Sequence, residues 1–289
     1  DCYFDRHDGQ AVTTEDFVRA LEAASGRDLT QFRRWYEQAG TPVVTASGEY
    51  VADQKIYRLT LSQQTPATPG QSDKAPLHMP ITLGLIGPDG QDLDFEGAEV
   101  SLDGQSRSQV LSLTEAQQVF EIKGVAQAPL PSIARGFSAP IKLLMDYSAE
   151  ELAFLCRHDS DPFNRWEAGQ RLAVLAIEAV QSQLAKGEAP VVMPLLIEVL
   201  QHHLDAALQQ AGDPAFDSEM VSLLLSLPSI QYLIELQTEV DVLQLLAARD
   251  RVRLQLAKAL SASFLAVYKA YHALTPFELN AHAVGARSL

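Results

Sequence analysis

The chain contains 289 residues, of which 47% are apolar and 20% charged, so it can form two or three domains with buried cores. The formal net charge of −15 disfavours binding to nucleic acid or to an anionic membrane surface, because both are negatively charged. Two cysteines, Cys2 and Cys156, cannot build a disulfide framework and fit a reducing compartment, so we predict a cytoplasmic location. No apolar run approaches the roughly 18 residues that span a bilayer.

Residues 1–39 are predicted to be helical. Thr13 and Asp16 have the spacing of a capping box at the start of one helix. Apolar residues follow it at helical spacing: Phe17, Leu21 and Ala24. A second helix is predicted to carry one apolar stripe of Leu29, Phe32 and Tyr36, with Trp35 beside it. Gly40 then supplies a C-terminal stop, with Pro42 just beyond it.

Residues 40–147 are predicted to form an antiparallel β-sandwich. Nine of the 15 prolines lie here, and the hydrophobic period becomes two. The apolar positions of three strands are Tyr57, Leu59 and Leu61; Leu77, Met79, Ile81, Leu83 and Leu85; and Ile141, Leu143, Met145 and Tyr147. Pro80 predicts that the second of these strands lies at an edge or carries a bulge. The loop 65–75 is expected to be the most mobile part of this unit.

Residues 148–289 are predicted to be all-helical. Ser148 with Glu151, and Thr275 with Glu278, fit the capping-box pattern, and Asp161 precedes a first-turn proline. The stretches 191–211, 218–227 and 240–274 are so apolar that each helix needs neighbours on more than one side. We therefore predict a multi-helix, solenoid-like layer, although no fixed repeat period supports a named repeat. A last helix is expected to begin at Pro276.

The search for catalytic motifs is negative. The sequence contains no His-Glu-x-x-His, no Cys-x-x-Cys and no glycine-rich phosphate loop. The segment 136–140 begins like a nucleophile elbow but lacks the final glycine and leads into a strand. We therefore assign no catalytic, cofactor-binding or metal-binding residue in this chain.

Four groups of residues could contribute to a catalytic or metal-binding site, and each has a simpler structural interpretation. His202 and His203 point about 100° apart on one helix, so they cannot share a metal from it and are interpreted as partly exposed histidines. Residues 158–161 contain a histidine and two aspartates, and are interpreted as the end of one helix and the cap of the next. His7 and the two residues after it are interpreted as a turn. Cys156 is interpreted as an inert buried thiol.

The segment 33–36 mixes cations and aromatics. In so acidic a chain we interpret it as part of a helix that has its aromatic side chains, Trp35 and Tyr36, in the core. Its arginines, Arg33 and Arg34, are expected to be paired or solvated.

Five separated segments, read in order, resemble bacterial aminopeptidase N, a gluzincin metallopeptidase. They are Tyr-Phe-Asp-Arg-His-Asp-Gly-Gln at 3–10, Phe-Arg-Arg-Trp-Tyr-Glu-Gln-Ala-Gly-Thr-Pro at 32–42, Leu-Thr-Leu-Ser-Gln-Gln-Thr-Pro-Ala-Thr-Pro at 59–69, Phe-Ser-Ala-Pro-Ile-Lys at 137–142 and Asp-Pro-Phe-Asn-Arg-Trp at 161–166. The resemblance covers about the first 170 residues by motif and the remainder by pattern.

The resemblance implies a division of the chain. Residues 1–39 would be the last helices of a thermolysin-like catalytic domain, 40–147 the β-sandwich that follows it, and 148–289 the beginning of a C-terminal helical domain. It also implies about 400 preceding residues, compatible with two further domains, and the start at Asp1 without an initiator Met fits this expectation.

The family's chemistry is the removal of N-terminal residues from peptides. A zinc-bound water attacks the peptide carbonyl, a glutamate acts as general base, and a carboxylate site binds the free α-amino group. The zinc motif and the Gly-x-Met-Glu-Asn motif match no position here, so the resemblance places zinc upstream and none in this chain.

The leading hypothesis is therefore a segment of a zinc aminopeptidase that is inactive alone, packs against the missing catalytic domain and serves as a spacer and helical cover. One alternative is a non-enzymatic protein-interaction module built from the same domains. A weaker one is an adhesive sandwich fused to a helical module, for which secretion would favour more cysteines.

Overall fold

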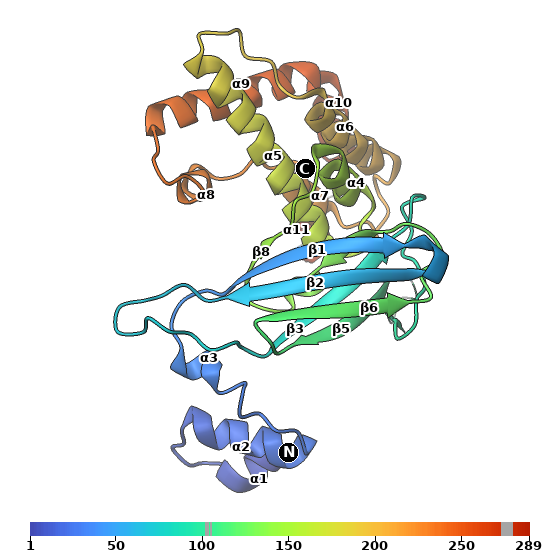
Figure 1. Ribbon diagram of the computed structural model, residues 1–289. Helices are drawn as coiled ribbons and strands as arrows, with labels where there is room; N and C mark the ends of the chain where they lie inside the picture. The colour runs from blue at the N-terminus through green and yellow to red at the C-terminus, as the bar shows by residue number, and fades with distance from the viewer. Residues whose placement is uncertain (102–103, 105, 273–279) are drawn as a thin grey trace.

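The computed structural model describes residues 1–101, 104, 106–272 and 280–289. Three regions follow one another along the chain (Figure 1). Short N-terminal helices lie on one side of a central β-sandwich, and a layer of longer helices lies on the other. The fold is thus a β-sandwich followed by an all-helical region, as the periodicity predicts.

The N-terminal region holds α1 (Cys2–His7), α2 (Thr14–Ser25) and α3 (Arg34–Glu37). The capping box is confirmed, because the Thr13 hydroxyl accepts from the Asp16 amide and the Asp16 carboxylate accepts from the Thr13 amide at 2.9 Å. The predicted second helix was too long, since only the single turn α3 is helical. Asp28 accepts the Thr30 amide at 2.8 Å, and this local turn competes with a helix from Leu29.

The segment 31–39 joins the N-terminal helices to the sandwich. Trp35 Nε1 donates to the His78 carbonyl oxygen at 2.9 Å. Arg33 is paired as predicted, with Nη1 and Nη2 on the two carboxylate oxygens of Glu22 at 2.7 Å each. The prediction of a core position was wrong for Tyr36, which is 54% exposed. The helix α3 has only one turn, so the predicted stripe of apolar residues does not form a continuous buried face.

The sandwich consists of two four-stranded sheets within the described residues. Their orders are β6-β2-β1-β8 and β4-β5-β3-β7. The first sheet contains β1 (Val43–Val51), β2 (Ile56–Gln64), β6 (Gln117–Lys123) and β8 (Lys142–Leu144). The second contains β3 (Met79–Ile86), β4 (Glu99–Val100), β5 (Arg107–Leu113) and β7 (Leu130–Ile133). Short 3₁₀ turns occupy Ala52–Gln54 (η1) and Arg135–Phe137 (η2).

The alternation of apolar residues is confirmed by burial. All five predicted core positions, Leu77 two residues before β3 and four within the strand up to Leu85, are at most 2% exposed. One strand pair departs from the antiparallel prediction, since β8 runs parallel to β1 over Val43–Thr45.

Pro80 lies in a stretch of β3 that has one strand partner. Residues 79–83 of β3 pair with β5, whereas β7 pairs only from Leu83 onward. On the side of β3 that has no strand partner at this point, the Thr82 amide donates to Ser138 Oγ at 2.9 Å. Pro80 lies two residues away, so its nitrogen, which carries no hydrogen, is directed to the same side. The strand is therefore internal overall but has a local edge at the proline.

The helical region begins at α4 and its elements surround one core. They are α4 (Ala149–His158), α5 (Pro162–Ala185), α6 (Pro194–Gln209), α7 (Ser218–Leu224), α8 (Ile230–Glu235), α9 (Val242–Ala259), α10 (Ser261–His272) and α11 (Ala281–Ser288). The predicted caps at Ser148 and Asp161 are confirmed. The predicted cap at Thr275 and the start at Pro276 lie outside the described residues. In the described ranges, no helix combines the length and hydrophobicity needed to cross a membrane.

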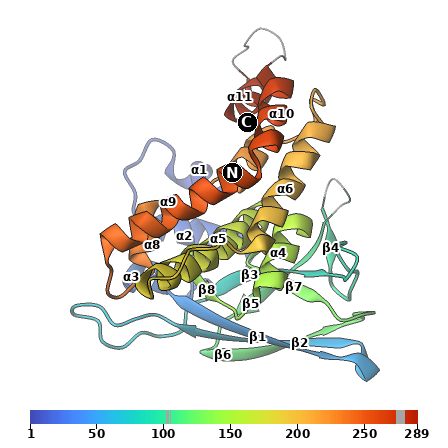
Figure 2. The ribbon, with the colours of Figure 1, turned by 90° about the horizontal axis from the view of Figure 1, so that it is seen from above.

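The helices stack over one end of the sandwich (Figure 2). Ile86, at the end of β3, is fully buried in the helical core rather than in the sandwich core. Tyr147 also belongs to that core, and its hydroxyl donates to the Pro131 carbonyl oxygen of β7 at 2.8 Å. The two cores therefore meet at this junction through apolar contacts and hydrogen bonds.

Ser148→Ala tests the start of the helical region. The substitution removes the side-chain acceptor of the Glu151 amide and should lower the free energy of unfolding by about 1 kcal/mol, measured by chemical denaturation. Ser182→Ala, at an exposed position inside α5, is the control and should change it by less than about 0.5 kcal/mol. Equal effects of the two variants would contradict the capping role.

Candidate functional site

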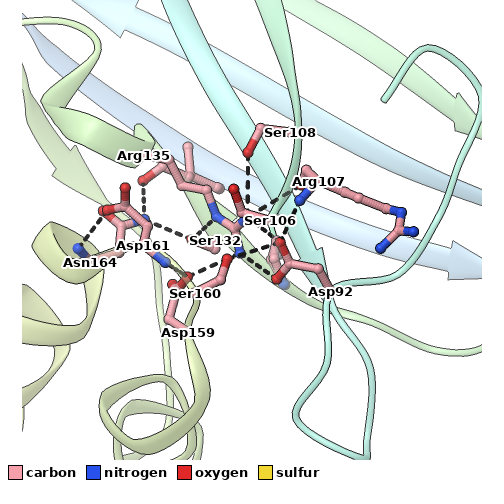
Figure 3. Close-up of polar contacts among 12 residues, drawn as sticks. Asp92, Ser106, Arg107, Ser108, Ser132, Arg135, Asp159, Ser160, Asp161 and Asn164 are labelled. Carbon is pink, nitrogen blue, oxygen red and sulfur yellow. Dashed lines mark hydrogen bonds and ion pairs between the residues drawn. The ribbon is translucent and has the colours of Figure 1, made fainter. Parts of the chain in front are cut away.

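The most strongly built polar cluster of the described chain lies between the sandwich and the helices, and we call it the Arg135 junction (Figure 3). The guanidinium of Arg135 binds both carboxylate oxygens of Asp92, with Nη1 at 2.7 Å and Nη2 at 2.9 Å. Nη2 also donates to Asp159 Oδ1 at 3.0 Å. All three side chains are at most 3% exposed, so this is a buried, bidentate ion-pair triad.

The three charged groups come from different elements. Asp92 follows β3, Arg135 lies in η2 after β7, and Asp159 is the first residue after α4 in the connection to α5. The backbone around Arg135 is unusual, because Ala134 and Phe137 have φ angles of 59° and 51°. Such backbone is costly for non-glycine residues and persists where surrounding contacts hold it.

Gly84 makes room for the guanidinium. A Cβ at this position of β3 would lie 2.0 Å from Cζ of Arg135. The side chain therefore lies directly over the strand backbone, an approach that a larger residue would block.

Polar neighbours extend the triad across the junction. Ser160 Oγ donates to Asp92 Oδ2 at 2.9 Å, and Asn164 Nδ2 donates to Ser132 Oγ at 2.8 Å. Asp161 accepts the Asn164 amide as the cap of α5 and the Gly136 amide of η2, both at 2.9 Å. Apart from the cap of α5, these contacts join the helical region to the sandwich, so the network sets the position of α5 on the sheet.

The two aspartates of the triad have opposite pKa shifts. Burial raises the pKa of Asp159 to about 6, against the attraction of Arg135. Burial also acts on Asp92, but its hydrogen bonds and charge pairing with Arg135 outweigh it and lower the pKa of that carboxyl. Asp159 Oδ2 has no hydrogen-bond partner among the described residues, which fits a proton on this oxygen at mildly acidic pH.

The Arg135 junction joins two domains and offers no exposed reactive group. Sequence reasoning identified residues 158–161 as a helix end and a cap, and Asp159 and Asp161 do occupy those positions. It missed Arg135 and Asp92. The signal that could have found them is Gly84, because an isolated glycine in an apolar strand marks a close approach.

The structure places the other candidates apart from this junction. His7 ends α1, and Gly9 adopts a φ of 71° in the turn after it. Ser138, in the elbow-like segment, accepts a backbone amide as described above.

His203 is 4% exposed, so the interpretation of both histidines as partly exposed was wrong for this residue. It faces the core from α6, and its Nε2 lies 3.5 Å from Cys156 Sγ of α4. Burial raises the pKa of the Cys156 thiol to about 12 and lowers that of His203 to about 4. Both groups are therefore neutral near pH 7, whereas a nucleophilic pair requires a thiolate.

Within the described residues, no group of three His, Cys, Asp or Glu side chains is arranged to hold a metal ion. The ring centroids of His158 and His202 lie 6.2 Å apart, and the nearby Cys156 is a buried thiol. This donor set does not fit zinc.

Asp159→Asn tests the electrostatics of the junction. Because the folded-state pKa of Asp159 is raised, its contribution to stability is fully present below about pH 4 and is lost as the pH rises through about 6. That loss is on the order of 3 kcal/mol in the wild type. The introduced asparagine side chain does not ionise, so the thermal stability of the variant relative to the wild type should increase between pH 4 and 7. In Asp92→Asn the stability should instead fall relative to wild type above pH 4, because the pKa of Asp92 is lowered. Parallel pH profiles for all three proteins would contradict the assignment.

The comparisons with known proteins agree with this architecture. Residues 40–146 match the family described as a domain of unknown function (DUF3458) with an Ig-like fold, and residues 149–289 match a second (DUF3458_C) with ARM repeats. Over the whole chain, the fold is similar to the crystal structure of Legionella pneumophila aminopeptidase A in complex with aspartic acid. The TM-score is 0.78 at 25% identity, and the match covers 99% of this chain and 31% of that one.

Curated relatives extend the same similarity. Aminopeptidase N of Escherichia coli (strain K12) is 38% identical over 270 residues, which is 93% of this chain and 29% of that protein. Aminopeptidase N of Caulobacter vibrioides is 37% identical over 291 residues, which is 100% of this chain and 31% of that protein. The chain thus spans less than a third of the length of these relatives. It is a homologue of aminopeptidase N that consists of the family's Ig-like and helical domains, preceded by a short helical segment.

Proposed function

We propose that this chain is the sandwich and part of the helical cover of a zinc aminopeptidase that removes N-terminal residues from peptides. The observation that carries the proposal is the 37–38% identity to aminopeptidase N over 93–100% of the chain. The sandwich would act as a spacer between a catalytic domain and the helices. The division into residues 1–39, 40–147 and 148–289 is part of the proposal.

The N-terminal helices support a contact with a further domain. Phe4, Phe17 and Leu21 are 65%, 43% and 40% exposed, although α2 buries Val18 and Ala20. Exposed aromatic and aliphatic side chains gathered on so small a unit are typical of a surface that packs against another body. We propose that this body is the catalytic domain, with residues 1–39 as its last helices.

Zinc and the reaction chemistry would belong to that domain and not to this chain. The charge of −15 favours neither nucleic acid nor an anionic membrane as a partner. The free cysteines Cys2 and Cys156 fit a cytoplasmic enzyme.

The purified chain should have no peptidase activity and no stoichiometric zinc. A catalytic zinc needs about three protein ligands and an open position, and we assign none of these here. Metal analysis after mild dialysis and release of an aminoacyl chromophore measure the two properties. Near-equimolar zinc, or turnover above the blank, would refute the proposed division of labour.

The alternative is a non-enzymatic module that uses the same domains to bind proteins. The sequence upstream of residue 1 in the longer protein discriminates between the two, since a non-enzyme should lack His-Glu-x-x-His. Measuring the peptidase activity of the longer protein tests the same distinction.

The helical region is suited to form a wall beside a cleft. Buried side chains from α4 to α11 share one core, so the helices move as a stack rather than singly. Such a wall would select peptides by size and act on KM, because it offers no group to the transition state.

Leu224→Ala tests the wall in the longer protein. Leu224 is 5% exposed in α7, and its truncation should cost about 2–5 kcal/mol and loosen the stack. The ratio of kcat/KM for a long peptide to that for a dipeptide-sized substrate should rise. Leu243→Ala, at a site 79% exposed in α9, is the control and should leave this ratio unchanged. An equal loss for both substrates, in step with a lower Tm, would mean that the helices only support the fold.

A further inference from the structure

A cavity lies between β1, the residues around the start of β7 and the start of α4. It has a volume of about 360 Å³, within the range of small-ligand pockets. Its walls include Gly48, Tyr50, Tyr57, Pro129, Asp146 and Glu151. None of these residues takes part in the Arg135 junction.

Tyr57 gives the cavity an unsatisfied polar group. Its side chain is only 4% exposed, yet its hydroxyl has no hydrogen-bond partner among the described residues. The neighbouring tyrosines are satisfied, since Tyr50 donates to the Val125 carbonyl oxygen at 3.1 Å and Tyr147 to Pro131. The hydroxyl oxygen is not among the fully buried atoms that lack a partner, so it is open to the cavity and available to a ligand or a water there.

Gly48 leaves the space that the hydroxyl occupies. A Cβ on this residue would lie 1.7 Å from the Tyr57 oxygen, and both residues line the cavity. The hydroxyl therefore sits at the cavity wall beside the backbone of β1.

The charge of the cavity is negative. Asp146 and Glu151 both line it, and no ion pair links either to a cation in the described part of the chain. Glu151 Oε2 accepts the Ser148 amide at 2.8 Å, which leaves Oε1 for another donor. Burial raises the pKa of the Tyr57 hydroxyl, and the negative charge of Glu151 raises it further, in keeping with their proximity.

One wall of the cavity is an open strand edge. β8 pairs with β1 only over Val43–Thr45, and β1 continues to Val51. From residue 46 onward, the edge of β1 on that side has no strand partner among the described residues. Open backbone groups of this kind accept an added extended segment.

We propose that this cavity binds the guanidinium or ammonium group of a basic side chain, carried by an extended peptide that lies along the open edge of β1. Glu151 and Asp146 supply the opposite charge, and the Tyr57 oxygen and Glu151 Oε1 accept hydrogen bonds from the cation. This peptide is a free partner in trans. The inference does not depend on the proposed enzymatic function, because no catalytic group is involved.

The test is fluorescence anisotropy with a fluorescein-labelled, N-acetylated pentapeptide, Thr-Val-Arg-Val-Thr, and its Gln analogue. N-acetylation prevents removal of the first residue by an aminopeptidase. The Arg peptide should bind at least about tenfold more tightly than the Gln peptide, and its binding should weaken with salt.

Two variants examine the cavity itself. Glu151→Gln keeps a residue that serves in capping boxes but removes the charge, and should weaken binding of the Arg peptide by about tenfold or more. Tyr57→Phe removes only the hydroxyl, which has no intramolecular partner to lose, and should weaken it several-fold. Glu150→Gln is the matched control, since it removes the same charge one residue away in α4 outside this cavity, and it should change binding less than twofold.

Three results would overturn the proposal. One is equal affinity for the Arg and Gln peptides, and another is equal effects of Glu151→Gln and Glu150→Gln. The third is binding to the 289-residue chain that disappears in a longer protein containing it, which would mean that the cavity holds a segment of the same protein. Circular dichroism of each variant checks that the fold is retained.

Discussion

The buried pairing of Arg135 with Asp92 and Asp159 is the interaction on which the relation between the two domains depends. A single guanidinium joins a loop after β3 to the connection between α4 and α5. Buried ion pairs add little net stability, because desolvation offsets much of the attraction. Their geometry is demanding, however, and any other position of α5 on the sheet would leave buried charges unpaired. The triad therefore specifies orientation more than it adds stability.

The apolar cores supply the stability that the triad does not. The sandwich core and the helical core are built mainly from side chains of their own region, and Ile86 and Tyr147 extend from the sandwich region into the helical core. Because hydrophobic contact is not directional, these cores alone would tolerate several ways of placing the helices. The polar network of Ser132, Ser160 and Asn164 around the triad removes that freedom.

The N-terminal segment is attached in a different way. Its contacts with the sandwich include hydrogen bonds from side chains of 31–38 to backbone carbonyls of 75–78 and 114, and Trp35 packs against the sandwich core. The exposed face of α1 and α2 carries aromatic groups. The N-terminal helices are thus attached through one short segment, whereas the helical region shares an extended junction with the sandwich.

The sequence by itself determined the local structure and the family. Helix caps at Thr13, Ser148 and Asp161, and the alternation along β3, depend on residues within a few positions of one another, so period and capping rules predict them. Only the tertiary structure decided that Arg135 meets Asp92, 43 positions away, and Asp159, 24 positions away. It also decided that His203 is buried and Tyr36 exposed, and that Tyr57 lines a cavity where its hydroxyl has no hydrogen-bond partner among the described residues. These features depend on which surfaces pack together, and packing between distant elements has no period that a single sequence displays.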